Sequence, residues 1–200
     1  MHNREPRYQG RTLTEWLEVY KNSMDPQGAS SAVMHEASTS AVKQIGTNAI
    51  PFLVKKVSMP GEGYWKQRLS AWIRSHPWIG LRLSPPAEQR LLGVYGFEIL
   101  GRDAESAIPA LASLTRHPGP AVRLMAMDCL CKMKPEKQIL LPILSPMLRD
   151  PNMILRKHAA MVFLELFPEE AEAAGVYKTY PALKPSGTNA FSTNAPVQNR

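Results

Sequence analysis

The sequence predicts an all-α fold, a short right-handed α-α solenoid of about four helical hairpins with an N-terminal capping helix and one helical insertion. The main observation is a 33-residue repeat in the second half of the 200-residue chain, in which residue size and breaker residues recur together. A hydrophobic fraction of 44% is sufficient for a real core. The repeat-equivalent sets are Arg90/Arg123/Arg156, Gly93/Ala126/Ala159, Phe97/Leu130/Phe163, Leu100/Met133/Leu166 and Pro85/Pro118/Pro151, with the pairs Ile108/Leu141, Pro109/Pro142, Leu111/Leu144 and Pro135/Pro168.

Residues 1–29 are expected to form a lead-in and a capping helix outside the repeat. Thr12 and Glu15 have the spacing of a capping box, and the helix is expected to end near Asn22. Behind the box comes an apolar stripe at helical spacing, Leu13, Trp16, Leu17 and Tyr20. A non-repeat helix with one apolar face suits a cap that covers the first exposed face of an array.

A repeat domain is expected over residues 30–174, beginning with a less regular helical pair over 30–58. Gly46 breaks this pair, and Pro51 stands near the first turn of the second helix, where its missing N–H is harmless. Matching Gly46 to Gly101 gives an offset of 55, so an insertion of about 22 residues, at about 59–83, interrupts the period.

The insertion holds three of the four tryptophans, and two interpretations of it stay open. It can be an extra helix with its aromatic residues packed on the array, or a lobe that binds a partner, because Trp and Arg are favoured at interfaces. A membrane-surface helix would be short for that role. The candidate partner-binding residues are Trp65, Trp72, Trp78, Arg68 and Arg74, with Lys55 and Lys56 on the preceding helix.

Three repeat copies follow, at about 88–117, 119–149 and 152–176, and the second helix of the last is degraded. In the first two copies, the second helix is expected to open at Ile108-Pro109 and at Leu141-Pro142. Acidic residues and a glycine over 169–175 are typical of a polar closing turn. Residues 175–200 have almost no apolar periodicity and are expected to form a mobile C-terminal tail.

These residues resemble the HEAT-repeat class of armadillo-type α-solenoids. That family repeats an acidic residue and proline in a turn, then Val-Arg-x-x-Ala early in the next helix; the matching residues here are Asp150-Pro151, Arg156 and Ala159, and Val122-Arg123 with Ala126. The segment 8–17 also resembles the lead-in of bacterial HEAT-repeat proteins of unassigned role, which often carry a membrane anchor.

The resemblance implies that the turn Asp pairs with the helix Arg in a ladder along the array. His117 and Ser84 occupy the positions equivalent to Asp150, so the ladder is expected to be incomplete. Arg90, Arg123 and Arg156 are interpreted as structural, because one cation at one position in each repeat suits a shared packing role. The same interpretation covers Pro118, Pro151, Pro109 and Pro142.

No catalytic or metal-binding motif is present, so the sequence predicts a protein that is not an enzyme and has no cofactor or metal site. The five histidines form no His-x-x-x-His pattern. Cys129 and Cys131 are two apart on a predicted helix and cannot supply a four-ligand site; we expect buried structural thiols, with a reactive thiol as the alternative.

The predicted function is a non-catalytic protein–protein interaction scaffold, because stacked hairpins offer a long groove. A charge of +7 and a pI near 9.5 favour an acidic partner, so the alternative is a nucleic-acid-binding HEAT protein with a basic surface, like the DNA-glycosylase solenoids. A lyase of the phycobilin type is a third hypothesis. The second helices of the hairpins offer only Lys55, Lys56 and Arg116, fewer cations than many phosphate contacts need. No apolar run is long enough to span a bilayer, and a cytoplasmic location is expected.

Overall fold

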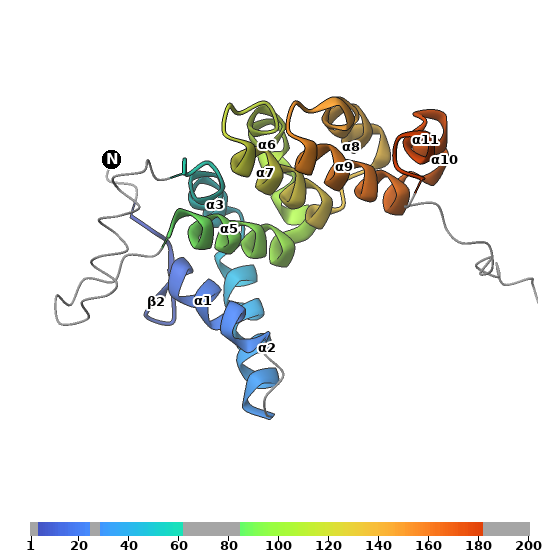
Figure 1. Ribbon diagram of the computed structural model, residues 1–200. Coiled ribbons are helices and arrows are strands. Elements are labelled where there is room, and N and C mark those ends of the chain that lie inside the picture. Colours follow the sequence, from blue (N-terminus) through green and yellow to red (C-terminus); the bar gives the residue numbers. More distant parts are fainter. Residues whose placement is uncertain (1–3, 25–28, 62–84, 182–200) are drawn as a thin grey trace, which may run out of the picture. The chain divides into compact units, whose positions relative to one another are not determined.

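A computed structural model of the chain describes residues 4–24, 29–61 and 85–181, and these are mostly helical (Figure 1). The predicted all-α class is confirmed. The chain divides into two compact units, residues 1–156 and 157–200. Trp65, Trp72, Trp78, Arg68 and Arg74 lie outside the described residues, as do most of the predicted insertion and residues 182–200 of the predicted tail.

The N-terminal capping box is confirmed. The Thr12 hydroxyl accepts a hydrogen bond from the Glu15 N–H, the Glu15 carboxylate accepts one from the Thr12 N–H, and helix α1 (Leu13–Ser23) follows. Its predicted stripe is buried, from Leu13 to Tyr20. A short antiparallel hairpin, β1 (Arg7–Tyr8) and β2 (Arg11–Thr12), precedes the helix and has no counterpart in the predicted elements.

The predicted first helical pair is present in the structure. Helix α2 (Ala29–Ile45) leads through the 3-10 turn η1 (Gly46–Ala49) into α3 (Ile50–Val57), with Pro51 in the first turn of α3. Helix α5 (Pro86–Leu100) ends in the same way, at Gly101 before η3 (Gly101–Ala107). Gly46 and Gly101 have φ of 59° and 54°, so both positions need the left-handed freedom of glycine.

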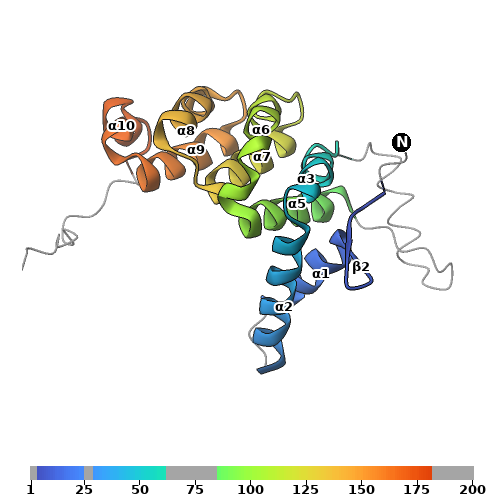
Figure 2. The same ribbon diagram turned by 180° about the vertical axis from the view of Figure 1, so that it is seen from behind.

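Helix α5 is central to the first unit, because it packs against α1, α2 and α3 and also against α7 (Pro120–Met133) (Figure 1 and Figure 2). Two glycines allow its close approach to α3. A Cβ on Gly93 would lie 2.7 Å from Val57 Cγ2, and one on Gly96 would lie 2.3 Å from Leu53 Cδ2. An added Cβ at either position would require Val57 or Leu53 to shift, so glycine at both positions allows the α3–α5 contact as it stands.

The two regular hairpins differ in where the second helix starts. Helix α6 (Ile108–Leu114) opens with Pro109 in its first turn, as predicted, and packs on α7. Helix α8 (Lys137–Leu144) begins at Lys137, so the prediction that it opens at Leu141-Pro142 is wrong and Pro142 lies inside the helix. The reason is local: Lys134 ends α7 in the left-handed conformation and Glu136, after Pro135, is the extended N-cap residue of α8.

After α8 the chain turns through η4 (Ser145–Arg149) and enters α9 (Met153–Leu166), which contains the boundary between the units. In the second unit, Phe163 and Phe167 pack edge to face, with ring centroids 5.5 Å apart. Helix α10 (Pro168–Ala173) and helix α11 (Val176–Thr179) follow, and Gly175 between them has φ of 70°.

Candidate functional site: the edge formed by consecutive turns

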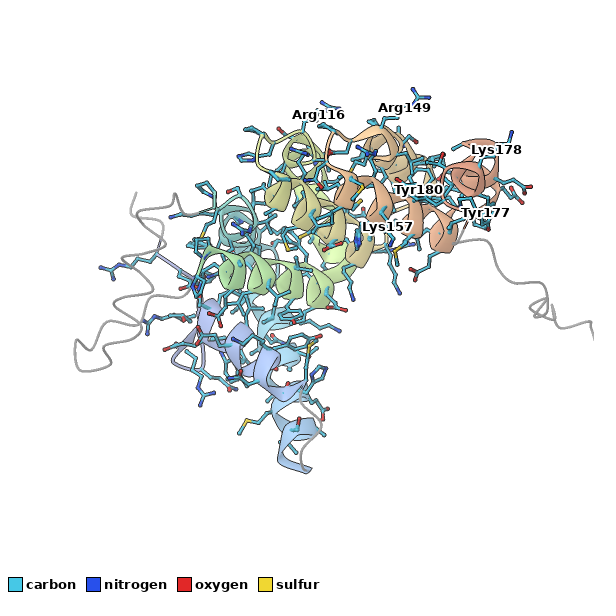
Figure 3. The ribbon with its side chains drawn as sticks, in the orientation of Figure 1. Arg116, Arg149, Lys157, Tyr177, Lys178 and Tyr180 are labelled. Carbon is cyan, nitrogen blue, oxygen red and sulfur yellow. The ribbon has the colours of Figure 1, made fainter. Side chains whose placement is uncertain are left out.

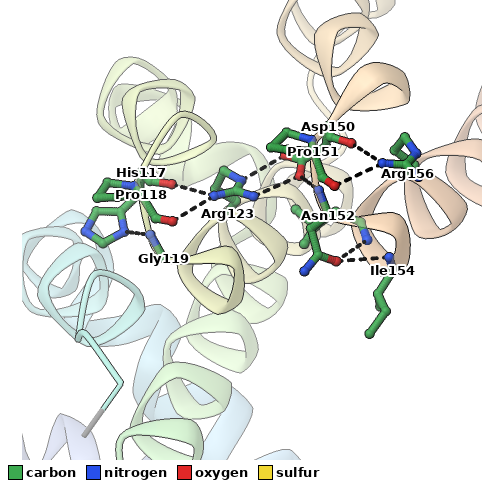
Figure 4. Close-up of polar contacts among 10 residues, drawn as sticks. His117, Pro118, Gly119, Arg123, Asp150, Pro151, Asn152, Ile154 and Arg156 are labelled. Carbon is green, nitrogen blue, oxygen red and sulfur yellow. Dashed lines mark hydrogen bonds and ion pairs between the residues drawn. The ribbon is translucent and has the colours of Figure 1, made fainter. Parts of the chain in front are cut away.

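Two repeat-equivalent arginines hold the turns that precede their helices. Arg123 on α7 donates from Nη1 to the carbonyl oxygens of His117 and Pro118, at 2.9 and 3.0 Å. Arg156 on α9 donates from Nη1 to the carbonyl oxygens of Asp150 and Pro151, at 2.7 and 3.0 Å (Figure 4). The acceptors stand six and five residues before each arginine, so the same turn is built twice at the repeat spacing.

A buried ion pair joins these two turns. The Arg123 Nε and Nη2 atoms donate to Asp150 Oδ2 and Oδ1, both at 2.8 Å, and the two side chains are 10% and 6% exposed. Asp150 Oδ1 also accepts from the Asn152 N–H at 2.8 Å (Figure 4). Burial by itself would raise the pKa of Asp150, but the hydrogen bonds from Arg123 and Asn152 and the charges of Arg123 and Arg156 outweigh it, so the pKa is lowered.

In the preceding turn, His117 occupies the position equivalent to Asp150 and makes the backbone contact but not the ion pair. Its Nδ1 accepts from the Gly119 N–H at 3.0 Å, as Asp150 Oδ1 accepts from Asn152. An imidazole has no carboxylate oxygen to pair with Arg90, the arginine one repeat before Arg123. Arg90 is buried and donates to the Met59 carbonyl oxygen at 2.7 Å; within the ranges that the structure describes it has no ion pair, and burial lowers its pKa.

A depression of about 450 Å³ lies where these consecutive turns meet. Its apolar lining comes from Ile143 on α8 and from Pro146 and Met147 on η4. Among the described residues of the lining, the cations are Arg116, Arg149 and the paired Arg123, and the only carboxylate is Asp150. Its wall also contains His117, Pro118 and Pro151 from the two turns, together with Thr115.

Arg116 and Arg149 are the free cations of this depression. Both are exposed, both point away from the ribbon at the same edge (Figure 3), and neither makes an ion pair with any residue in the described ranges. They are 33 residues apart, so they are repeat equivalents, as are Pro118 and Pro151. The sequence analysis named Arg116 but not Arg149, although the repeat spacing that found the structural arginines would have found this pair too.

The two lysines proposed from the sequence have different environments. Lys55 is exposed on α3. Lys56 is 8% exposed and its Nζ donates to Gln89 Oε1, and burial lowers its pKa. The ammonium of Lys56 is therefore engaged inside the first unit, and Lys55 is the lysine of the pair that faces solvent.

The two cysteines, Cys129 and Cys131, both lie on α7. Cys129 is buried, as predicted, and burial raises the pKa of its thiol well above the ordinary value; Cys131 is half-buried. Across the described ranges, no group of three or more His, Cys, Asp or Glu side chains is arranged to hold a metal ion. No helix in the same ranges is long and apolar enough to cross a membrane.

Comparison of the chain with protein-family models, with curated proteins and with solved structures finds no match.

Proposed function

We propose that this chain is a HEAT-like α-solenoid that acts as a non-catalytic scaffold for a protein partner. The fold part of the proposal is supported by the duplicated turns. Arg123 and Arg156 make the same pair of carbonyl contacts, and Gly46 and Gly101 end equivalent helices with the same sign of φ. Copied contacts of this kind are what stacking of one repeated unit requires.

The functional part rests on one observation, that the depression is itself built from repeat-equivalent residues. Arg116 and Arg149, and likewise Pro118 and Pro151, are 33 residues apart and line it together. A surface that recurs with the repeat suits an extended chain lying across the repeats better than a small substrate held at one point. The buried charges nearby, Arg123 and Asp150, are engaged with each other and with the backbone of the two turns.

A nucleic-acid-binding role is the alternative, favoured by the net charge of +7. Two free arginines over an apolar lining are a small electrostatic footprint for it, since each phosphate contact needs its own cation. An apolar floor has a clear use in protein recognition, where buried apolar anchors supply most of the binding energy. The cytoplasm is the compartment that this proposal assumes, consistent with two cysteines, Cys129 and Cys131, that form no disulfide.

The proposal is tested by affinity capture with the full chain, before and after nuclease treatment, followed by titration with the purified candidate. We expect saturable binding of a protein that survives nuclease treatment. A gel-shift titration with duplex and single-stranded DNA, at two salt concentrations, tests the alternative. Tight binding to nucleic acid that weakens steeply with salt, with no protein retained, would refute the scaffold proposal.

The same capture tests the tryptophan-rich segment predicted from the sequence. A variant with Trp65, Trp72 and Trp78 all changed to Ala is compared with the wild-type protein, after circular dichroism shows that both are folded. If the partner is recovered equally, the segment has no part in binding, and the scaffold proposal then depends on the surfaces in the described ranges.

A further inference from the structure

We propose that the turn groove, defined by Arg116, Ile143, Pro146, Met147 and Arg149, binds an acidic extended segment of the protein partner. This inference rests on the proposed scaffold function and specifies the chemistry of the partner. Two carboxylates of the segment would pair with Arg116 and Arg149, and an apolar side chain between them would lie on Ile143 and Met147.

Charge is the first reason for an acidic ligand. Asp150 is the one carboxylate in the lining, and both of its oxygens already accept from Arg123. The turn groove therefore presents the charges of Arg116 and Arg149 without internal compensation from its own lining. Guanidinium groups bind carboxylates with two parallel hydrogen bonds, a geometry that gives specificity as well as energy.

The apolar floor is the second reason, and it distinguishes a peptide from a simple anion. Ile143 is half-buried, Pro146 is exposed and Met147 is buried with one face on the groove. A free phosphate or a nucleic-acid backbone makes no use of such a surface. A volume of about 450 Å³ lies within the range of about 300 to 1,000 Å³ typical of ligand pockets, so a side chain can enter it.

The two longest segments outside the described ranges do not have the charge that the turn groove selects. Residues 62–84 contain one acidic residue, Glu62, against four Lys and Arg residues, and residues 182–200 contain no acidic residue. Charge complementarity therefore favours a different protein as the occupant.

The test is a fluorescence-anisotropy titration of the full chain with a labelled peptide in which two glutamates stand four residues apart, with a leucine midway between them. Alternate side chains of an extended chain share one face, so the two glutamates, about 13 Å apart, and the leucine between them can face the groove together. We expect the Arg116→Glu/Arg149→Glu variant to bind this peptide about tenfold or more weakly than the wild-type protein. It should gain affinity for the same peptide with lysine in place of glutamate.

The matched control is Lys43→Glu/Arg102→Glu, which changes the net charge equally at exposed positions outside the groove. It should bind the acidic peptide within about twofold of the wild-type protein at moderate salt. Thermal melting verifies that both variants are folded, which is expected because all four side chains are exposed.

Any one of the following results would overturn the inference. The first is equal weakening by the control variant, which would show a response to net charge alone. The second is an affinity that the Arg116/Arg149 reversal leaves unchanged, or no peptide binding at all. The third is that the Arg116→Glu/Arg149→Glu variant loses binding to nucleic acid while its binding to the acidic peptide is unchanged. A protein captured equally by the wild type and the groove variant would leave the scaffold function standing while refuting this site.

Discussion

Changing Asp150 to Asn should destabilise the first unit by about 3 kcal/mol at pH 7. Removing one member of a buried ion pair typically costs about 3 to 5 kcal/mol, and the Arg123 and Asp150 side chains are only 10% and 6% exposed. The lower end applies because Arg123 keeps its bonds to the carbonyl oxygens of His117 and Pro118. In the variant, the amide nitrogen of Asn would face one of the arginine donors that the carboxylate now satisfies.

The pH dependence of this loss identifies its cause. The pKa of Asp150 is lowered in the folded protein from an ordinary value of 3.8. Its contribution to stability is therefore complete above that value and is lost as pH falls through the lowered pKa, because the unfolded chain takes up the proton first. The difference between wild type and variant should be constant near neutral pH and should shrink below about pH 4.

Urea unfolding of both proteins from pH 7 down to the lowest pH at which they fold measures this difference. Asp103→Asn, at an exposed carboxylate on η3, is the control and should change the free energy of unfolding by less than about 0.5 kcal/mol. An Asp150→Asn loss below about 0.5 kcal/mol at pH 7, or one that is independent of pH, would refute the role given to the ion pair.

Three further substitutions test the repeat geometry and the buried lysine. His117→Asp should stabilise the protein by about 1 kcal/mol or more, because a carboxylate at this position can still accept from the Gly119 N–H and can also pair with buried Arg90, which has no ion-pair partner among the described residues. Urea unfolding measures the change, and a loss of stability would contradict the equivalence of His117 and Asp150. Gly93→Ala should destabilise the protein by about 1 to 3 kcal/mol, measured by thermal melting, because the added Cβ would lie 2.7 Å from Val57 Cγ2. Alanine favours a helix more than glycine does, so a higher melting temperature would show that α3 and α5 can move apart at no cost. Lys56→Met should be more stable than the wild-type protein at pH 7, and the difference in the free energy of unfolding should shrink as pH rises toward 10.5. The reason is that folding lowers the pKa of Lys56, so the stability of the wild-type protein rises with pH in that range. Unfolding curves that give the same difference at about pH 7 and pH 10 would contradict this explanation.

The sequence predicted the helical class, the N-terminal capping box and the break at Gly46 because each depends on local chemistry. A hydroxyl and a carboxylate three residues apart satisfy free N–H groups wherever a helix starts, and glycine is the residue that most readily takes a positive φ. The periodic pattern also found the positions of Arg123 and Arg156, because a copied contact leaves a copied residue.

What the sequence could not predict depends on contacts between segments. Pro142 was expected to open a helix because Pro109 does. In the structure Lys134 ends α7 and Glu136 is the N-cap residue of α8, so the helix starts before Pro142. Which of two possible start positions a helix uses depends on how it packs, and the sequence does not show that. The burial of Lys56 depends on how α3 meets α5. The turn groove joins residues from two turns, so it emerges only when the hairpins are placed together, although the spacing of Arg116 and Arg149 was visible.

Hydrogen–deuterium exchange of the full chain, with and without the acidic peptide, tests the central claim most directly. If a partner segment lies across consecutive turns, the peptide should slow amide exchange in residues 115–119 and in residues 145–152 together, and in the Arg116→Glu/Arg149→Glu variant it should slow neither. Protection confined to one of these turns, or found only in other parts of the chain, would contradict the account.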